Sequence, residues 1–211
     1  MQYRFGKKND ISRIAYLHHK VRQTYDMGFF STVKKSFLKE YYKILISDPN
    51  EIILCAEDDN GIIQGFCSGS LNVTKQKQLL NKNKWKLGFA LIPTIINKPK
   101  ILLEGIKRYK SITTNSKLEE KFIINEGARS EYWTWNNEEK DSESSVVLLN
   151  KFYNILFILG CKEVNFEVDL CNKKVYKFHL YNGAELMNTF TLSDGRERAI
   201  LKYNLEIKFK S

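Results

Sequence analysis

The chain has 211 residues and a mass of 24.8 kDa, a length that suits a single domain. Apolar residues make up 43% of the sequence and there are only 3 prolines, which excludes collagen-like and Pro/Gly-rich disordered classes. Lysine and arginine outnumber aspartate and glutamate by 34 to 24, so the formal net charge is +10.

Most of this basic excess is lysine. Recognition of bases and bidentate binding of phosphates favour arginine, so we expect attraction of a small anionic ligand rather than nucleic-acid binding. A nucleic acid or a membrane surface is the alternative. The longest apolar stretches, residues 146–149 and 155–159, are too short to cross a bilayer, and residues 1–8 lack the apolar core of a signal peptide. We therefore expect a soluble cytoplasmic protein without stable membrane insertion.

The cysteines and histidines show no metal-ligand spacing. Cys55, Cys67, Cys161 and Cys171 form no CxxC pair, and in a reducing compartment we expect small buried hydrophobes rather than disulfides or a zinc site. His18 and its neighbour at position 19 lie on a predicted helix, where adjacent rings point about 100° apart. No metal is expected.

Apolar periodicity and turn residues predict an α/β order of elements. We expect strands at residues 3–5, 52–57, 62–71, 130–135 and 164–168, and a final hairpin of residues 186–192 and 198–209. Helices are expected at residues 10–21, from Ser31 or Thr32 to residue 45, at 146–159 and at 172–182. This order predicts one domain over residues 1–211 with a mixed sheet.

On the same grounds, we expect residues 78–112 to form a helical insertion that is broken at Pro93 and Pro99. The segment is basic and amphipathic. Such a pattern suits packing on the domain surface, with membrane contact as the alternative.

The polar run at residues 136–145 joins a predicted strand to a long apolar helix. The first amides of a helix lack intrahelical partners, so this arrangement favours an anion site. The sequence contains none of the GxGxxG, P-loop, GxSxG or HExxH motifs.

The last quarter of the chain carries a spaced set of residues that is fairly specific. It consists of Val168, Asp169, Asn172, Val175, Phe178, His179, Gly183 and Ala184. These positions follow the family ending V-D-x-x-N-x-x-A-x-x-F-Y-x-x-x-G-F, and the whole chain resembles the GNAT superfamily of N-acetyltransferases in element order. The resemblance implies a central mixed β-sheet flanked by helices, a helical insertion after the third strand, and acetyl-CoA as cofactor. The insertion resembles a subgroup that acts on amino sugars of surface polysaccharides.

The resemblance places the coenzyme A pyrophosphate at residues 140–145. Lys140 takes the basic position of the family loop, but Glu143 and Ser145 replace its two glycines. Glycine lets the backbone approach a phosphate, whereas a carboxylate repels one. The hydroxyls of Ser142, Ser144 and Ser145 could donate to phosphate instead, or could simply cap the helix.

The same resemblance brings the thioester arm close to residues 133–136 and includes Asn172 among the cofactor-binding residues. Trp133 and Trp135 share a face with Glu131 if the strand is regular. Both indoles could alternatively be core or the wall of a groove.

Two residues are candidates for catalysis. His179 stands where the family has the tyrosine that protonates the leaving thiolate, and a histidine of ordinary pKa, about 6.5, could act as a general acid. Glu131 could accept the proton of the incoming ammonium, because Arg129 occupies the usual acidic position. The alternatives are a hydrogen-bonded helix histidine and a surface strand charge.

An aromatic loop between the first two helices is the expected acceptor pocket. It holds Tyr25, Asp26, Phe29 and Phe30, and aromatic rings with a carboxylate suit a sugar, a base or an amine. Core packing of Phe29 and Phe30 is the alternative.

The sequence thus predicts an acyl-CoA-dependent N-acyltransferase that acetylates a primary amine of a small molecule such as an amino sugar. The altered loop and catalytic positions leave a catalytically inactive binding module as the alternative. The protein could form a homodimer.

Overall fold

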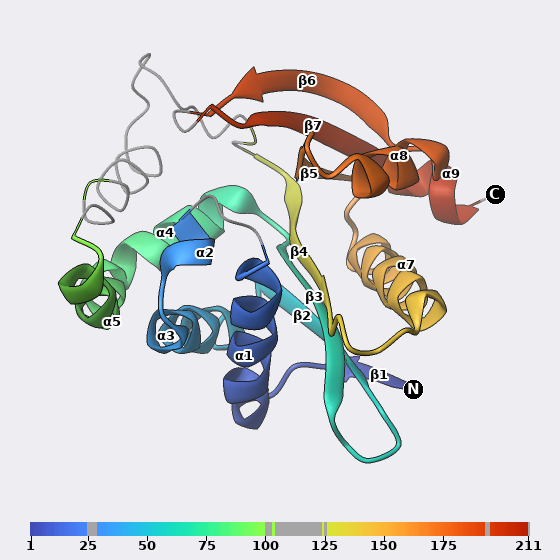
Figure 1. Cartoon of the computed structure of the whole chain (residues 1–211). Coiled ribbons are helices and arrows are strands. Elements are labelled where there is room, and N and C mark those ends of the chain that lie inside the picture. The colour runs from blue at the N-terminus through green and yellow to red at the C-terminus, as the bar shows by residue number, and fades with distance from the viewer. Residues whose placement is uncertain (25–28, 100–102, 104–123, 125, 193–194, 211) are drawn as a thin grey trace.

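A mixed β-sheet organises the molecule. The computed structural model describes residues 1–24, 29–99, 103, 124, 126–192 and 195–210. The strands in these ranges form one seven-stranded sheet in the order β1-β2-β3-β4-β5-β7-β6 (Figure 1). Strands β4 and β5 are parallel, and all other neighbouring strands are antiparallel. The predicted α/β class with a mixed sheet is confirmed.

The strands fall close to their predicted positions. They are β1 (Gln2–Phe5), β2 (Glu51–Glu57), β3 (Ile63–Ser70), β4 (Ala128–Trp135), β5 (Glu163–Asp169), β6 (Glu185–Thr191) and β7 (Glu197–Asn204). The turn after β2 contains Gly61 at φ 77°, a conformation that glycine adopts without strain.

Helices cover both faces of the sheet (Figure 1). On one face lie α1 (Ile11–Arg22), α2 (Phe29–Thr32), α3 (Lys35–Ile46), α4 (Val73–Lys82) and α5 (Lys84–Asn97). On the other lie α7 (Ser142–Ile158), α8 (Lys173–Tyr181) and α9 (Leu205–Lys210). The helices α4 and α5 form the insertion expected after the third strand.

The prediction that Pro93 breaks this insertion is wrong. Helix α5 runs through Pro93, which is exposed, and ends at Asn97. Proline lacks an amide, so the carbonyl of Phe89 loses one intrahelical partner without ending the helix. Pro99 does follow the helix end. The expected remainder of the insertion, to residue 112, lies outside the described residues except for position 103.

Two other predicted boundaries are also wrong. The helix expected from Ser31 or Thr32 is split into α2 and α3, because Lys34 adopts an extended conformation. Residues 205–209 were expected to continue the last strand but form α9. The side chain of Asn204 accepts a hydrogen bond from the amide of Ile207 at 3.1 Å, which caps this helix.

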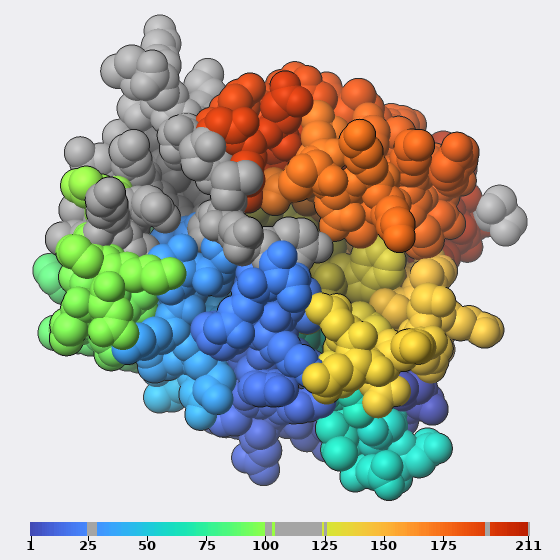
Figure 2. All heavy atoms as spheres, in the orientation of Figure 1, coloured from blue at the N-terminus to red at the C-terminus, as the bar shows by residue number. Residues whose placement is uncertain are grey.

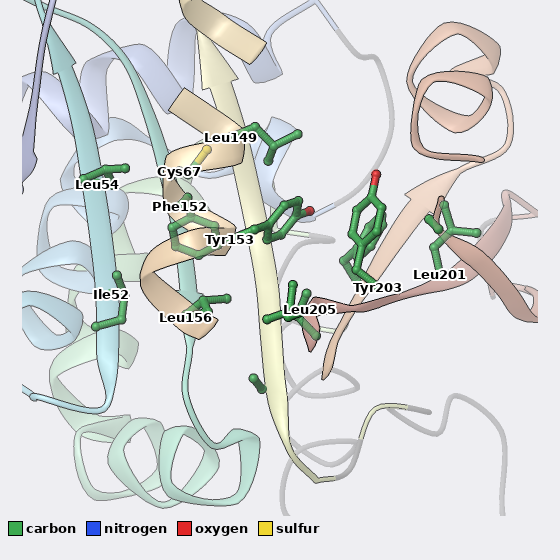
Figure 3. Packing of buried hydrophobic residues seen from close by; sticks show 14 of the residues in the cluster. Ile52, Leu54, Cys67, Leu149, Phe152, Tyr153, Leu156, Leu201, Tyr203 and Leu205 are labelled. Atoms are coloured by element: carbon green, nitrogen blue, oxygen red, sulfur yellow. The ribbon is translucent and has the colours of Figure 1, made fainter. Parts of the chain in front are cut away.

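The larger core lies between the sheet and α7. Phe152, Tyr153 and Leu156 of α7 are at most 1% exposed, and they pack on alternate residues of the strands (Figure 3). The apolar positions of α7 cover most of its circumference, as expected for a helix covered on two sides. Helix α9 and Tyr203 of β7 close this core (Figure 3).

A second core lies between the opposite face of the sheet and the helices α1 and α3. Leu17, Leu38 and Phe66 are fully buried there. His18 is also fully buried, with Nδ1 2.6 Å from the hydroxyl of Tyr42. His18 is therefore a core residue.

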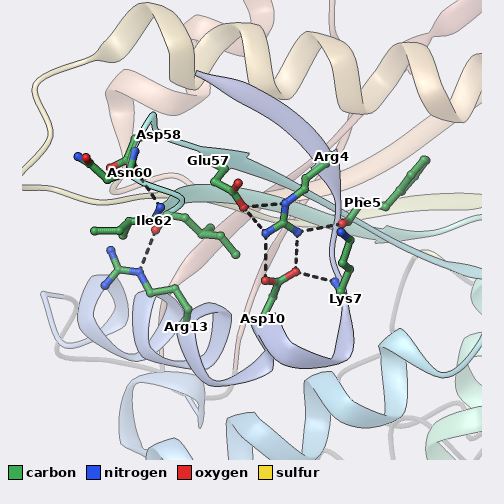
Figure 4. A network of polar contacts seen from close by, with 10 residues as sticks. Arg4, Phe5, Lys7, Asp10, Arg13, Glu57, Asp58, Asn60 and Ile62 are labelled. Carbon is green, nitrogen blue, oxygen red and sulfur yellow. Dashed lines mark hydrogen bonds and ion pairs between the residues drawn. The ribbon is translucent and has the colours of Figure 1, made fainter.

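A network of ions fixes the edge of the sheet to the start of α1 (Figure 4). Arg4 of β1 donates to the carboxylates of Glu57 and Asp10, the latter at 2.6 and 3.1 Å. Asp10 also accepts from the amide of Lys7 at 2.7 Å. Burial by itself would raise the pKa of Asp10. The hydrogen bonds from Arg4 and Lys7 outweigh burial, so the pKa is lowered. Asp10 thus stabilises the entry to α1 through Arg4, and its carboxylate makes no cap bond within the helix.

The pairing of β4 changes abruptly near its centre. Ser130 pairs with Gly69 and Tyr132 pairs with Ser68, so Glu131 is an extra residue, a β-bulge. On its other side, β4 pairs with β5 only up to Ser130, although β4 continues to Trp135 and β5 to Asp169. The two parallel strands therefore separate beyond Ser130.

Gly69 allows the close approach at this bulge. A Cβ atom on Gly69 would lie 2.3 Å from the carbonyl oxygen of Arg129 and 2.9 Å from Cζ of Phe152. Gly69→Ala should therefore lower the free energy of unfolding by about 2 kcal/mol or more in chemical denaturation. Gly88→Ala is the matched control, because a Cβ there meets nothing within 4 Å. That change, inside α5, should stabilise the protein by about 0.5–1 kcal/mol. A Gly69→Ala protein as stable as the wild type would contradict this account of the bulge.

Candidate functional site

A pocket of about 230 Å³ opens where β4 and β5 separate. Its lining comes from both faces of the sheet. Ser130, Trp133 and His179 belong to the side of α7 and α8, whereas Phe30 and Glu131 belong to the side of α1 to α3. A ligand in this pocket can therefore contact groups on both faces.

Glu131 is held on the α3 side of the pocket. Its side chain is 9% exposed, and its carboxylate accepts a hydrogen bond from the hydroxyl of Tyr41 at 3.0 Å. The guanidinium of Arg129 lies 4.0 Å from the other carboxylate oxygen. These two contacts orient a carboxylate in the pocket wall, and the pKa of Tyr41 is raised by burial and by the charge of Glu131.

The charge of Glu131 continues into a network across three strands, which we call the charge network. Arg129 donates to Glu167 at 3.2 Å, and Arg198 bridges Glu167 at 2.7 Å and Asp169 at 2.6 Å. Arg196 completes the network, 3.0 Å from Asp169. All of these residues line the pocket. The three carboxylates of the network each contact a guanidinium, so this wall is polar without being strongly anionic.

Glu51, at the start of β2, is a second buried carboxyl group near the site. It is 7% exposed and accepts hydrogen bonds from Gln76 at 2.7 Å and Asn50 at 2.9 Å. Burial, followed by the negative charge of Glu131, raises its pKa to about 8. Glu51 is thus mostly protonated at neutral pH, so it adds little repulsion to the carboxylate of Glu131.

His179 lines the opposite side of the pocket and is 3% exposed. Its Nδ1 lies 3.0 Å from the hydroxyl of Tyr203, and its ring packs against Phe166 and Trp133. Burial lowers the pKa of His179 to about 4, with a smaller effect of the Lys208 charge. The ring is therefore neutral at pH 7, and the expectation of an imidazolium that titrates near neutrality is wrong.

The two tryptophans do not share a face with Glu131, because the bulge at Glu131 breaks the alternation of β4. The indole of Trp133 donates to the carbonyl and hydroxyl oxygens of Ser145 at 3.1 and 3.0 Å, on the α7 side. Trp135 donates to the carbonyl of Glu139 at 3.2 Å. Trp133 lines the pocket, whereas Trp135 holds the loop that precedes α7.

The loop expected to bind pyrophosphate is acidic and already capped. Asp141 is the N-cap of α7, and its carboxylate accepts from the amide of Ser144 at 2.9 Å. Hydrogen bonds from Ser144 lower the pKa of Asp141. The idea that the serines themselves cap the helix is thus wrong, since Asp141 does so. Lys140, Ser142 and Glu143 are exposed beside it.

The expected acceptor residues are only partly described. Phe29 and Phe30 line the pocket, and their rings pack against each other and against Phe37. Phe29 and Phe30 therefore pack among other aromatic rings and also line this pocket. Tyr25 and Asp26 lie outside the described residues. Asn172 lines the pocket and caps α8 by accepting from the amide of Val175 at 3.4 Å.

Sequence reasoning missed most of the charge network. Glu167 and Asp169 alternate with apolar residues of β5, and Arg196 and Arg198 flank the start of β7. That alternation indicates one polar face, but only the strand register places these residues opposite one another. The contact of Tyr41 with Glu131 was also not predicted.

Within the described ranges, no cluster of three or more His, Cys, Asp or Glu residues could hold a metal ion. Among these residues, no helix is long and apolar enough to cross a membrane. Cys55 and Cys67 are buried as expected and Cys161 is half-buried, but Cys171 is exposed, so the prediction is wrong for that residue.

Solved structures with a similar fold are acetyltransferases. A spermidine N-acetyltransferase from Vibrio cholerae superposes with a TM-score of 0.60 at 13% identity, over 99% of this chain and 98% of that chain. A structure from Salmonella typhimurium, described as an acetyltransferase with its cofactor acetyl-CoA, gives 0.59 at 11% identity, over 97% and 94%. A structure from Desulfovibrio desulfuricans, described as an acetyltransferase of the GNAT family, gives 0.57 at 10% identity, over 97% and 98%.

No family model matches the sequence, and neither does any curated protein. At these identities the similarity shows the fold. The chain thus has the GNAT fold that its element order predicted.

The lowered pKa of His179 makes a prediction about stability. Its pKa is about 4 when folded and about 6.5 when unfolded, so between these values the unfolded chain binds a proton that the folded chain does not. The stabilisation is complete above pH 6.5 and is lost as the pH falls towards 4. From pH 7 to pH 5 it should lower the free energy of unfolding by about 2 kcal/mol.

The measurement is denaturant unfolding of the wild type and of His179→Gln at pH 7 and pH 5. Carboxylates lower the stability of both proteins alike, so the wild type should lose about 2 kcal/mol more than the variant. Equal losses would show that His179 titrates normally in the folded protein.

Proposed function

We propose that this protein is an acyl-CoA-dependent N-acyltransferase that acetylates a primary amine on a small molecule such as an amino sugar. The observation that carries the proposal is the pocket at the separation of β4 and β5, with Glu131 on one face of the sheet and His179 on the other. Such a pocket lets two substrates approach from opposite faces and meet in the plane of the sheet. The solved acetyltransferases with the same fold support this reading.

The acceptor amine would enter on the α1–α3 side. Glu131, oriented by Tyr41 and Arg129, would attract the ammonium group and accept its proton, directly or through a water. Phe29 and Phe30 offer aromatic surface to a sugar ring. The charge network offers N–H donors and carboxylate acceptors to hydroxyl groups, and its paired charges suit a small polar amine better than a polycation.

Acetyl-CoA would supply the acetyl group as an activated thioester. The separated strands fit its extended arm, because β4 beyond Ser130 no longer pairs with β5. Trp133, Asn172 and His179 would line the arm. His179 is neutral at pH 7, so its contribution is one hydrogen bond through Nε2 rather than the delivery of a proton from an imidazolium.

The pyrophosphate end fits less well than the arm. Asp141 takes the place that a phosphate oxygen would occupy at the Ser144 amide, and Glu143 adds a second negative charge in the first turn. Lys140 is the nearest cation in the sequence of the loop. Ser142 and Ser145 would add hydroxyl groups, although Ser145 already accepts from Trp133. We therefore expect weaker coenzyme binding than a glycine-rich loop would give.

Transfer of the acetyl group tests the proposal directly. Purified protein is incubated with acetyl-CoA and a panel of primary amines that includes amino sugars, and free thiol is measured. Glu131→Gln should lower kcat/KM at least about 100-fold for the amine that reacts, because the proton acceptor is lost. Glu163→Gln, an exposed carboxylate on β5, should leave it unchanged. Absence of both turnover and acetyl-CoA binding would favour the catalytically inactive module instead.

Charge changes in the loop test where the pyrophosphate lies. Glu143→Gln should strengthen coenzyme A binding about fivefold, because one repulsion of about 1 kcal/mol is removed. Lys140→Ala should weaken it about tenfold. Glu185→Gln removes another exposed carboxylate, from β6, and should change nothing. Calorimetric affinities that are equal in all four proteins would place the pyrophosphate away from this loop.

A further inference from the structure

Helix α5 exposes a stripe of large apolar side chains that the proposed reaction does not use. Trp85 is 73% exposed, Phe89 69%, Ile92 46% and Ile96 76%. Their spacing of four, three and four residues places them on one side of the helix. Figure 2 shows α5, in green, at the surface of the molecule. We call these four residues the α5 stripe.

The other side of α5 is already packed. Leu91 is 8% exposed and Thr94 is 2% exposed, and Leu91 belongs to the core formed with α3. The hydroxyl of Thr94 also accepts a hydrogen bond from the amide of Lys34 at 3.0 Å. The helix is therefore fixed to the domain, and the stripe faces outward from a rigid support.

The charged residues of α4 and α5 all have the same sign. Helices α4 and α5 contain five lysines and no acidic residue, and the sequence has no aspartate or glutamate from Asn60 to Leu103. Lys84 and Lys86 flank Trp85 in the sequence, so each lies about 100° from it around the helix, at the two borders of the stripe. Apolar side chains between lysines, with a tryptophan among them, are the pattern of a helix that lies in a membrane interface.

We propose that the α5 stripe and its lysines bind the surface of a bilayer that contains anionic lipids. The four apolar side chains enter the interface, and the lysines contact the acidic headgroups. The binding is peripheral and reversible, because α5 has 14 residues and spanning needs about 20. The proposal is independent of the acetyl transfer.

Charge decides between a membrane and a second copy of this chain. A symmetric dimer places the same patch on both subunits. The exposed lysines of α4 and α5 include Lys75, Lys82 and Lys86, and a dimer through this face would bring like charges of the two copies together. Anionic headgroups carry the opposite charge, so they suit this face better than a second copy does.

The experiment is sedimentation of the full chain with vesicles of phosphatidylcholine alone or mixed with phosphatidylserine. We expect binding to the mixed vesicles that weakens with added salt, and little binding to phosphatidylcholine. Lys84→Gln with Lys86→Gln should weaken binding about fivefold per lysine. Lys173→Gln with Lys174→Gln, an exposed pair on α8, should weaken it much less.

A second pair of variants tests the apolar part. Phe89→Ser with Ile96→Ser should lower vesicle binding at least tenfold. Ile158→Ser with Ile207→Ser, which are 72% and 69% exposed elsewhere, should leave it unchanged.

Three results would overturn the proposal. The first is equal binding, or no binding, to the two kinds of vesicle. The second is a loss of thermal stability in the stripe variant that its control lacks, which would mean that the chain itself covers the stripe. The third is a dimer in sedimentation equilibrium that only the stripe variant abolishes.

Discussion

The separation of β4 from β5 is the constraint on which the rest of the site depends. Strand β4 must pair with β3 on one side and with β5 on the other, and it satisfies both only as far as Ser130. The extra residue Glu131 then bends the strand, as bulges do, and Gly69 provides the space for the bend. A sheet that paired along its whole length would hold no pocket between these strands.

The same bulge divides the chemistry between the two faces of the sheet. Glu131 turns towards Tyr41 and Trp133 turns towards α7, so the carboxylate of Glu131 and a neutral His179 line one small pocket from opposite sides. On the side of Glu131, guanidinium groups contact each carboxylate of the charge network. Burial keeps the other side uncharged. In the proposed reaction, the attacking amine and the thioester would meet these two different environments.

Much of the fold and part of the site could be predicted from the sequence. Alternating apolar residues and turn glycines indicated the strands, and the spacing from Val168 to Ala184 indicated the GNAT resemblance, which located Asn172 and His179 on the pocket. The bulge could not be predicted, because only the pairing of β4 with β3 makes Glu131 the extra residue. The pKa of His179 and the partners of the charge network depend on burial and strand register, which local sequence does not contain.

The most direct test of the central claim is a crystal structure of the protein with acetyl-CoA. The account predicts that the thioester sulfur lies between β4 and β5 beyond Ser130 and Phe166, within reach of His179, with the acetyl carbon facing Glu131. A thioester bound elsewhere on the protein, or strands that pair beyond Ser130, would contradict the account.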